Sequence, residues 1–332
     1  MKNNIITLLS IGGILLAGCT KSPSAEHSWA TDPEAVRIEA SVGALTKTNP
    51  SGTAEEQTKF NGPVGKFLGD EIAVSMVDNS AGQVEKTVTY RFDGEVWNPV
   101  QANDYLVWKT PVTYKAWYPA SSKDGFTLPT DQRESNGTQA TVGSFAKADF
   151  MTGEYVCDSK DDIPSDHKLR LVMNRKMALV TVNVDKDRVK SEFADKDIYI
   201  IRVESIQSGH SVVSADGIGS GDAVDVMPGP YDAAYQNGKG SFNAIVVPCD
   251  GDASARFLKI TVGWRSDSDP FGATKDFYVT GRPAFEAGKH YTYNVTIGKD
   301  KIESGDVSVN DWGVEVDLGG GNDEFEVSPS LV

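Results

Sequence analysis

Cysteine, histidine and basic side chains are scarce in this chain. Its 332 residues include three cysteines, four histidines and 32 lysines and arginines, against 47 aspartates and glutamates. The histidines show no short spacing to one another or to cysteine, so we expect no zinc site. The formal net charge of −15 repels phosphate backbones, so we expect no nucleic-acid partner.

Motifs of enzymes are also missing. The sequence has no Gly-x-Ser-x-Gly elbow and no His-Glu-x-x-His pair. The glycine-rich stretches at 219–223 and 319–322 lack the strand-to-helix context of a phosphate loop. The acidic runs at 158–162 and 185–197 lack the ligand spacing of an EF-hand loop, so we interpret them as solvated faces. We therefore predict a chain that is not an enzyme and holds no metal or cofactor.

Long apolar runs are limited to the N-terminus. Residues 5–16 are almost wholly apolar, a run shorter than the roughly 20 residues that a membrane-spanning helix needs. The run is typical of a secretory signal peptide, and its ending Leu-Ala-Gly-Cys resembles the bacterial lipobox. This predicts that residues 1–18 are removed and that Cys19 is acylated, so that lipid alone holds the protein at a membrane. The alternative is an ordinary signal peptide followed by a chance cysteine.

Two cysteines remain after Cys19. An exported protein matures where disulfides form, so Cys157 and Cys249 are candidates for a bridge. They are equally well interpreted as two small buried hydrophobic residues. The sequence leaves both interpretations open.

Alternation of apolar and polar residues dominates the rest of the chain and predicts an all-β fold. The expected strands are 36–42, 71–77, 86–92, 112–119, 168–173, 178–184, 197–206, 242–248, 256–264, 275–281 and 289–298. They recur at a spacing that suggests β-sandwiches. Residues 20–34 are expected to be a flexible tether, and we place a domain boundary near residue 175.

Four tryptophans lie in or beside these strands. Packing in the core is their ordinary role, and a platform for stacking sugar rings is the functional alternative. The residues concerned are Trp97, Trp108, Trp117 and Trp264.

The first strand and the last extended segment have matching patterns. Each presents four apolar side chains at every second position, which places them on one face of a strand. The first set is Val36, Ile38, Ala40 and Val42, and the second is Trp312, Val314, Val316 and Leu318.

This match suggests an exchange of strands between molecules. Lys47 follows the first strand in a polar loop, where a trypsin-like protease could cut. If the first strand then left, the C-terminal segment of a second copy would fill the open edge, and head-to-tail repetition would build a filament. The alternative is that both segments are ordinary strands of their own domains.

Five stretches of the chain resemble a known family when taken together with the lipobox. The stretches are TDPEAVRIEASVGALTK, YKAWYP, DFMTGEY, LRLVMNRKMALVTVNV and FEAGKHYTYNVTIGKDKIESGDVSVNDW. In this order they resemble the fimbrillin-family lipoproteins of Bacteroidales, which are the subunits of type V pili.

The resemblance implies two tandem transthyretin-like Greek-key β-sandwich domains, preceded by a segment that proteolysis removes. The expected division is a signal peptide at 1–18, a tether and first strand at 19–47, and domains at 48–175 and 176–332. Lys47 becomes the candidate processing site, although the best-known members are cut after arginine and the nearest arginine, Arg37, lies inside the first strand. The residues 36–42 become the candidate displaced strand, and residues 312–318 the candidate donor.

The implied function is that of a structural subunit of a fimbrium that supports cell adhesion. Its expected partners are other pilus subunits, a processing protease and, through lipid such as palmitate, the outer membrane at the cell surface. The alternative is an unprocessed surface lipoprotein that binds glycans or host ligands.

Overall fold

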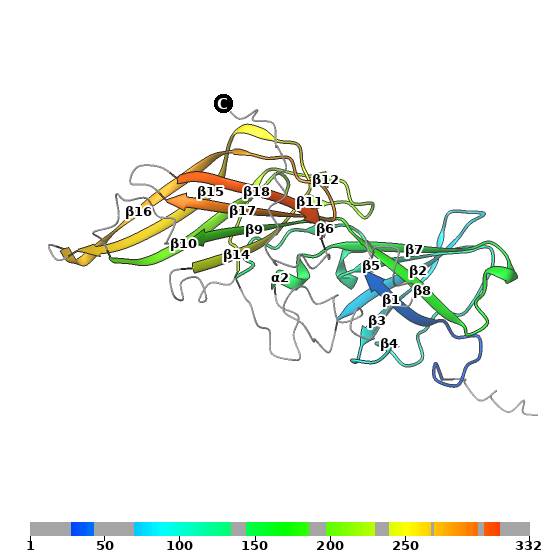
Figure 1. Cartoon of the computed structure of the whole chain (residues 1–332). Helices are drawn as coiled ribbons and strands as arrows, with labels where there is room; N and C mark the ends of the chain where they lie inside the picture. Colours follow the sequence, from blue (N-terminus) through cyan, green and yellow to red (C-terminus); the bar gives the residue numbers. More distant parts are fainter. Residues whose placement is uncertain are drawn as a thin grey trace, which may run out of the picture.

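The structure, a computed structural model, describes residues 28–42, 70–133, 144–185, 197–229, 239–266, 269–297 and 302–312. Within these ranges the fold is all-β, which confirms the expected fold class (Figure 1). Helical structure in the same ranges is short: α2 (Ser144–Lys147) and the 3-10 turns η2 (Ala120–Ser122) and η3 (Lys160–Asp162).

Strands of the N-terminal half close into a barrel, which we call the N-terminal barrel. Its strands in chain order are β1 (Arg37–Val42), β2 (Glu71–Asp78), β3 (Val84–Phe92), β4 (Trp97–Pro99), β5 (Val112–Tyr118), β7 (Met151–Cys157) and β8 (Lys168–Arg175). They are hydrogen-bonded in the order β1-β4-β3-β2-β5-β7-β8, and β8 meets β1 to close the ring. Every pairing is antiparallel except that of β1 with β8, which is parallel.

The barrel interior is filled by alternate side chains of each strand. In β5 the buried residues are Val112, Tyr114, Ala116 and Tyr118. The residues between them face outward, which is why the period-two pattern could be recognised in the sequence. Closure of the ring follows from the position of β1 and is a feature that strand spacing alone did not predict; the expected Greek-key sandwich stays a prediction for this half.

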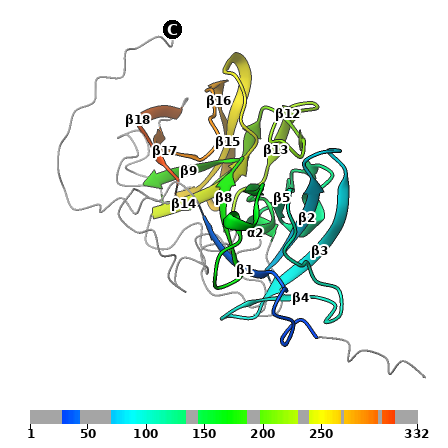
Figure 2. The same cartoon turned by 90° about the vertical axis from the view of Figure 1, so that its right-hand side faces the viewer.

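The C-terminal half forms a sandwich of two four-stranded sheets, which we call the C-terminal sandwich (Figures 1 and 2). The first sheet has the order β14-β9-β17-β18, and comprises β9 (Ala178–Asp185), β14 (Lys239–Val246), β17 (Lys289–Ile297) and β18 (Ile302–Asp311). The second has the order β13-β10-β15-β16, and comprises β10 (Asp197–Ser208), β13 (Val224–Val226), β15 (Asp252–Ser266) and β16 (Asp269–Arg282). Val180 and Val182 of one sheet and Ile260 and Val262 of the other lie in one buried core.

The chain between β5 and β7 crosses from the barrel to the sandwich. Its strand β6 (Phe126–Thr127) pairs with β11 (Val212–Val213), which also pairs with β12 (Gly219–Ser220). Phe126 stacks on Phe150 with ring centroids 5.3 to 5.5 Å apart, at 5.4 Å, and both belong to the sandwich core. This excursion was not predicted, and it joins the two halves by more than the single connection near residue 175.

The crossing segment also covers the edge of β14. The Gln132 side chain accepts a hydrogen bond from the amide of Ile245 and donates one to its carbonyl, both at 2.8 Å. Gly229 forms a further bridge to Asn243. Since an uncovered edge strand can pair with other molecules, these contacts protect this side of the sandwich.

Each predicted strand coincides with an observed one, but several elements were not predicted. Strands β4 and β7 are additions, and β18 was only partly anticipated. The expected flexible tether is also different in its described part, because residues 28–34 form turns against the barrel. There the Tyr105 hydroxyl donates a 2.8 Å hydrogen bond to Asp32.

Candidate functional site

The first strand, β1, closes the N-terminal barrel. It pairs in parallel with β8 over six residue pairs, from Arg37 opposite Lys168 to Val42 opposite Met173. Toward β4 it forms a single antiparallel pair, Ile38 with Trp97. The strand is therefore held by a regular ladder on one side and by few backbone contacts on the other.

The inward face of β1 is the apolar face that the sequence predicts. Val36, Ile38, Ala40 and Val42 are all buried, with at most 8% of any residue exposed. They belong to the barrel core. Burying three aliphatic side chains of this size stabilises the strand by on the order of 5 to 9 kcal/mol.

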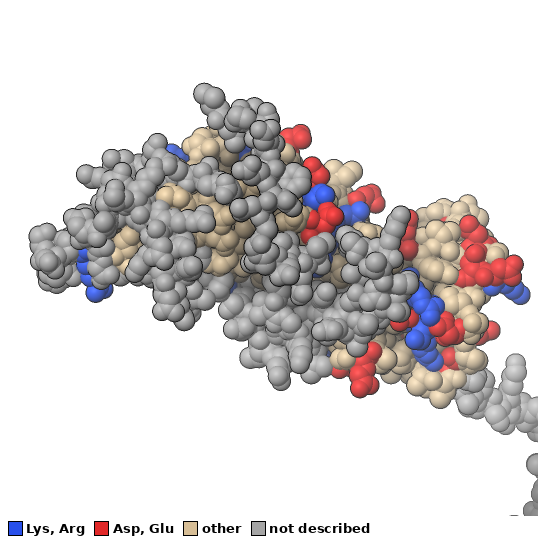
Figure 3. Space-filling model, viewed as in Figure 1, with Lys and Arg blue, Asp and Glu red and all other residues tan. Residues whose placement is uncertain are grey.

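The outward face of β1 carries ion pairs. Glu39 lies 3.3 Å from Arg170 Nε and 3.8 Å from Lys168 Nζ on the neighbouring β8. The basic partners are about half exposed, so each pair contributes little, within about 1 kcal/mol. Figure 3 shows the same mixture of acidic and basic side chains over the visible face of the barrel.

An arginine and a tryptophan hold the start of β1. The Arg37 guanidinium carbon lies 4.4 Å from the centre of the Trp29 ring, within the range of a cation–π contact. Arg37 Nη1 also donates to the Trp29 carbonyl, and Trp29 Nε1 donates to the Val36 carbonyl at 3.3 Å. We call this pair the leading clasp.

A second arginine and tryptophan meet at the end of β18. Trp312 is buried, and the Arg175 guanidinium carbon lies 4.4 Å from the centre of its ring. Arg175 Nη1 donates to the Trp312 carbonyl at 3.4 Å. We call this pair the trailing clasp. Of the candidate donor residues only Trp312 is described; Val314, Val316 and Leu318 lie outside the described residues, as do Cys19 and Lys47.

Buried acidic groups lie beside the trailing clasp. Asp149 Oδ2 accepts a 3.0 Å hydrogen bond from Arg175 Nε, and burial raises the pKa of Asp149 despite this partner. Asp70 Oδ1 accepts a 3.1 Å hydrogen bond from the Tyr118 hydroxyl. Burial, together with the charge of Asp149, raises the pKa of Asp70 from its ordinary 3.8 to about 7.

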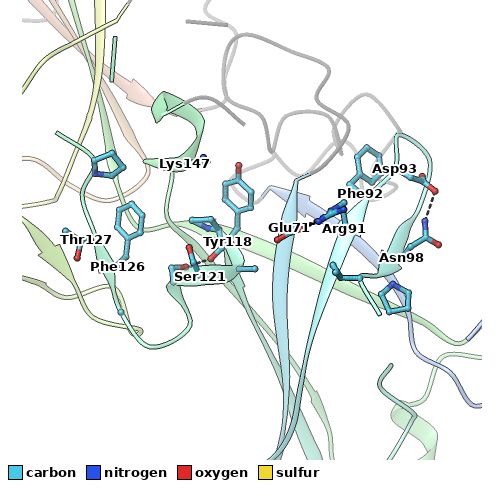
Figure 4. Close-up of a pocket in the computed structure, with 17 residues that line it drawn as sticks. Glu71, Arg91, Phe92, Asp93, Asn98, Tyr118, Ser121, Phe126, Thr127 and Lys147 are labelled. Atoms are coloured by element: carbon cyan, nitrogen blue, oxygen red, sulfur yellow. Dashed lines mark hydrogen bonds and ion pairs between the residues drawn. The ribbon is translucent and has the colours of Figure 1, made fainter. Parts of the chain in front are cut away.

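A cleft of about 1130 Å³ opens between the barrel and the crossing segment (Figure 4). One side carries two hydrogen-bonded pairs, Arg91 with Glu71 and Asn98 with Asp93. The other side carries Phe126, Thr127 and Lys147. The rings of Phe92, Tyr118 and Phe126 line the cleft but are buried, so they offer little surface for stacking a ligand.

The tryptophans of the described core favour packing over sugar binding. Trp97 and Trp108 are buried in the barrel core. Trp117 and Trp264 are partly buried and pack against the sandwich core, and Trp117 Nε1 donates to the Ala215 carbonyl at 3.3 Å. These positions support the structural interpretation of the sequence.

Cysteines and histidines do not come together in the described part of the chain. Cys157 and Cys249 are not bridged, so the disulfide alternative is wrong in this structure. His290 Nε2 lies 2.8 Å from the Thr181 hydroxyl. Among the described residues no cluster of three or more metal-ligating side chains is found. Their helices are also too short or too polar to cross a membrane.

These features define an all-β protein whose first strand closes a barrel and whose C-terminal end leaves from a buried clasp. The family model described as fimbrillin-like matches residues 66–312. Because the match covers most of the sequence, the chain belongs to the fimbrillin-like family, which confirms the resemblance.

Solved structures show the same fold. A proposed cell adhesion protein from Bacteroides ovatus is 13% identical and matches with a TM-score of 0.52 over 85% of this chain and 99% of that one. A proposed cell adhesion protein from Bacteroides uniformis is 17% identical, with a TM-score of 0.49 over 84% and 99%. The fimbrial anchor protein Mfa2 from Porphyromonas gingivalis is 11% identical, with a TM-score of 0.39 over 84% and 97%. No curated protein matches this chain.

The buried network was missed by sequence reasoning. Arg175 and Asp149 each stand beside strand-like segments, where single charged residues ordinarily face solvent. The one available signal was that Asp149 is followed directly by the apolar pair Phe150 and Met151.

Proposed function

We propose that this chain is a structural subunit of a cell-surface pilus, assembled by exchange of β strands and supporting adhesion. Membership of the fimbrillin-like family supports a pilus-subunit or adhesin role at the cell surface, and a structural rather than an enzymatic one. The observation that carries the finer proposal is the position of β1, which closes the barrel in parallel with β8 and meets β4 at only one pair.

This position makes β1 replaceable but not free to leave. Its apolar side chains fill the barrel core, so departure without a substitute would expose them and the sockets they occupy. A strand from another molecule with apolar residues at every second position would restore both the core and the ladder to β8. Exchange therefore needs an apolar donor rather than simple loss of β1.

Processing would release β1 from the remainder of the barrel. In the proposal, Cys19 is lipidated and anchors the precursor at the outer membrane. A protease then cuts after Lys47, which lies between β1 and β2 in the chain. The segment 19–47 would leave, and domains 48–175 and 176–332, in our proposal both transthyretin-like, would form the mature subunit.

The donor would come from the C-terminal end of a second copy. Val314, Val316 and Leu318 continue the period-two pattern beyond Trp312 and match the spacing of the buried β1 residues. Because the contact joins the tail of one molecule to the barrel of the next, repetition would build an open filament.

A lipoprotein that stays intact and binds a ligand is the second candidate. The cleft beside Glu71, Arg91 and Lys147 is the feature that favours it. The buried tryptophans, by contrast, give no support to a sugar-stacking platform.

Intact-mass analysis of protein taken from its native cells separates the two candidates. Assembly predicts surface polymers whose subunits begin at Thr48 and lack Cys19. A surface protein that always retains lipidated Cys19 and β1 would contradict processing and favour the intact lipoprotein.

Charged substitutions test the donor. We expect Val314→Asp combined with Val316→Asp to abolish polymers seen by electron microscopy while leaving the monomer folded. Val309→Asp is the matched control, because Val309 is on β18 and 52% exposed. Polymers that persist in the double variant would exclude this segment as the donor.

A further inference from the structure

The chain beyond β18 leaves the sandwich from a fixed point. The Trp312 amide donates a 2.7 Å hydrogen bond to the Gly288 carbonyl. The Trp312 ring is 7% exposed and belongs to the sandwich core. Trp312 is therefore seated in its own molecule, and any segment used for exchange begins after it.

Arg175 holds this residue from the barrel side. It is the last residue of β8, and its guanidinium both covers the Trp312 ring at 4.4 Å and donates to the Trp312 carbonyl at 3.4 Å. A planar guanidinium can make both contacts at once, whereas a lysine ammonium cannot reproduce this geometry. The contact joins residues 137 positions apart in the chain, so it connects the end of the barrel to the end of the sandwich.

Asp149 in turn fixes the arginine. The Asp149–Arg175 pair is almost fully buried, with 0% and 7% of the two side chains exposed. Backbone hydrogen bonds from Lys176 to Phe150 and from Gly288 to Met177, at 2.9 and 2.8 Å, fix the surrounding chain. Burying two charges is costly, and an apolar pair of equal volume would often serve stability as well or better. The pair is thus better explained by the geometry that it imposes.

We propose that Arg175, held by Asp149, is a positioning residue that fixes Trp312 and thereby the point and direction at which the C-terminal segment leaves the body. The use of that segment as a donor rests on the proposed function above, but the anchoring itself does not. The leading clasp offers a comparison, since Arg37 and Trp29 have the same 4.4 Å separation at the other end of the proposed exchange. That clasp is only half-buried and has no buried aspartate behind it among its printed partners.

Hydrogen exchange measured by mass spectrometry tests the anchoring in the full chain with only the signal segment 1–18 omitted. In Arg175→Lys the positive charge beside Asp149 is kept. We expect the peptide that contains Trp312 to exchange about tenfold faster, the change expected when a desolvated cation–π contact is lost. Peptides from β9 and β17 should be unchanged.

Three further variants keep the test decisive. Trp312→Leu leaves the Asp149–Arg175 pair intact and should also accelerate exchange of the C-terminal peptide. Trp312→Phe retains an aromatic ring beneath the guanidinium and should restore slow exchange. Arg37→Lys is the matched control, and should accelerate exchange of the Trp29 peptide alone.

Two results would overturn the proposal. One is unchanged exchange of the Trp312 peptide in Arg175→Lys. The other is faster exchange spread equally over β9, β17 and the C-terminal peptide, which would indicate a merely structural role. A separate assembly assay asks whether Arg175→Lys reduces polymer yield. Normal polymers from a variant with a released Trp312 would refute positioning for assembly, whereas absence of polymers from the wild-type chain would refute the proposed function and leave the exchange result valid.

Discussion

Asp70 makes the stability of this protein depend on pH in a way that one substitution should remove. The residue is fully buried at the start of β2, and its Oδ2 atom has no hydrogen-bond partner among the described residues. Burial is the largest cause that raises its pKa to about 7, and the nearby charge of Asp149 adds to it. The Tyr118 hydroxyl acts in the opposite direction by donating to Oδ1.

The sign of the effect follows from where the proton is held. Between about pH 4 and pH 7 the folded chain keeps a proton on Asp70 that the unfolded chain, with its ordinary pKa of 3.8, has released. The free energy of unfolding therefore falls as pH rises through this window. A difference of about 3 pKa units corresponds to a loss on the order of 4 kcal/mol, complete above about pH 7.

Replacing Asp70 with asparagine should abolish this loss. The amide stays neutral, and its carbonyl can accept the Tyr118 hydroxyl as the protonated acid does. Urea unfolding followed by tryptophan fluorescence at about pH 5 and about pH 8 provides the measurement. We expect the wild-type chain to lose roughly 2 to 3 kcal/mol more than Asp70→Asn across this interval.

The control is Asp124→Asn, because 82% of the Asp124 side chain is exposed. It should follow the wild-type pH profile. Asp149 is present in all three proteins, and its own raised pKa contributes a decline of the same sign to each. If Asp70→Asn and the wild-type chain decline in parallel, the assignment of the raised pKa to Asp70 is wrong.

Three shorter predictions concern packing and thiols. Ile38→Ala should lower the free energy of unfolding by about 2 to 4 kcal/mol in urea, because the side chain is buried in the barrel core, whereas Ser41→Ala on the outward face should change it by less than about 0.5 kcal/mol. Gly209→Ala should cost about 1 to 3 kcal/mol by the same assay, since the new Cβ would lie 2.3 Å from that of Cys249; a neutral result would refute this close approach. With a thiol reagent Cys249 should react in the folded chain and Cys157 only after denaturation, and a mass unchanged by reduction would exclude a bridge.

Most strands of this protein were predictable because their signal is local. Alternating residues must face opposite sides of a strand, so the buried set of β1 could be identified from spacing alone. The same reasoning placed the residues of β5 and β9 correctly. Short elements such as β4 escaped, since three residues are too few to show a period.

The candidate site was predictable only in part. Its apolar face was evident from the sequence, and the structure shows those four side chains in the barrel core. The parallel partner of β1 was not, because strand pairing depends on how distant segments close the ring. The assignments of Cys19 and Lys47 stay predictions, since both residues lie outside the described ranges.

By itself the sequence determined the all-β class and the inward face of each long strand, and its stretches carried the family resemblance. Tertiary structure alone decided that β1 closes a barrel, that residues 126–150 cross to the sandwich, and that Asp149 and Arg175 meet Trp312. The physical reason is range. Side-chain alternation is a property of neighbours in the chain, whereas a lone charged residue looks like a surface residue until folding buries it beside a partner more than a hundred positions away.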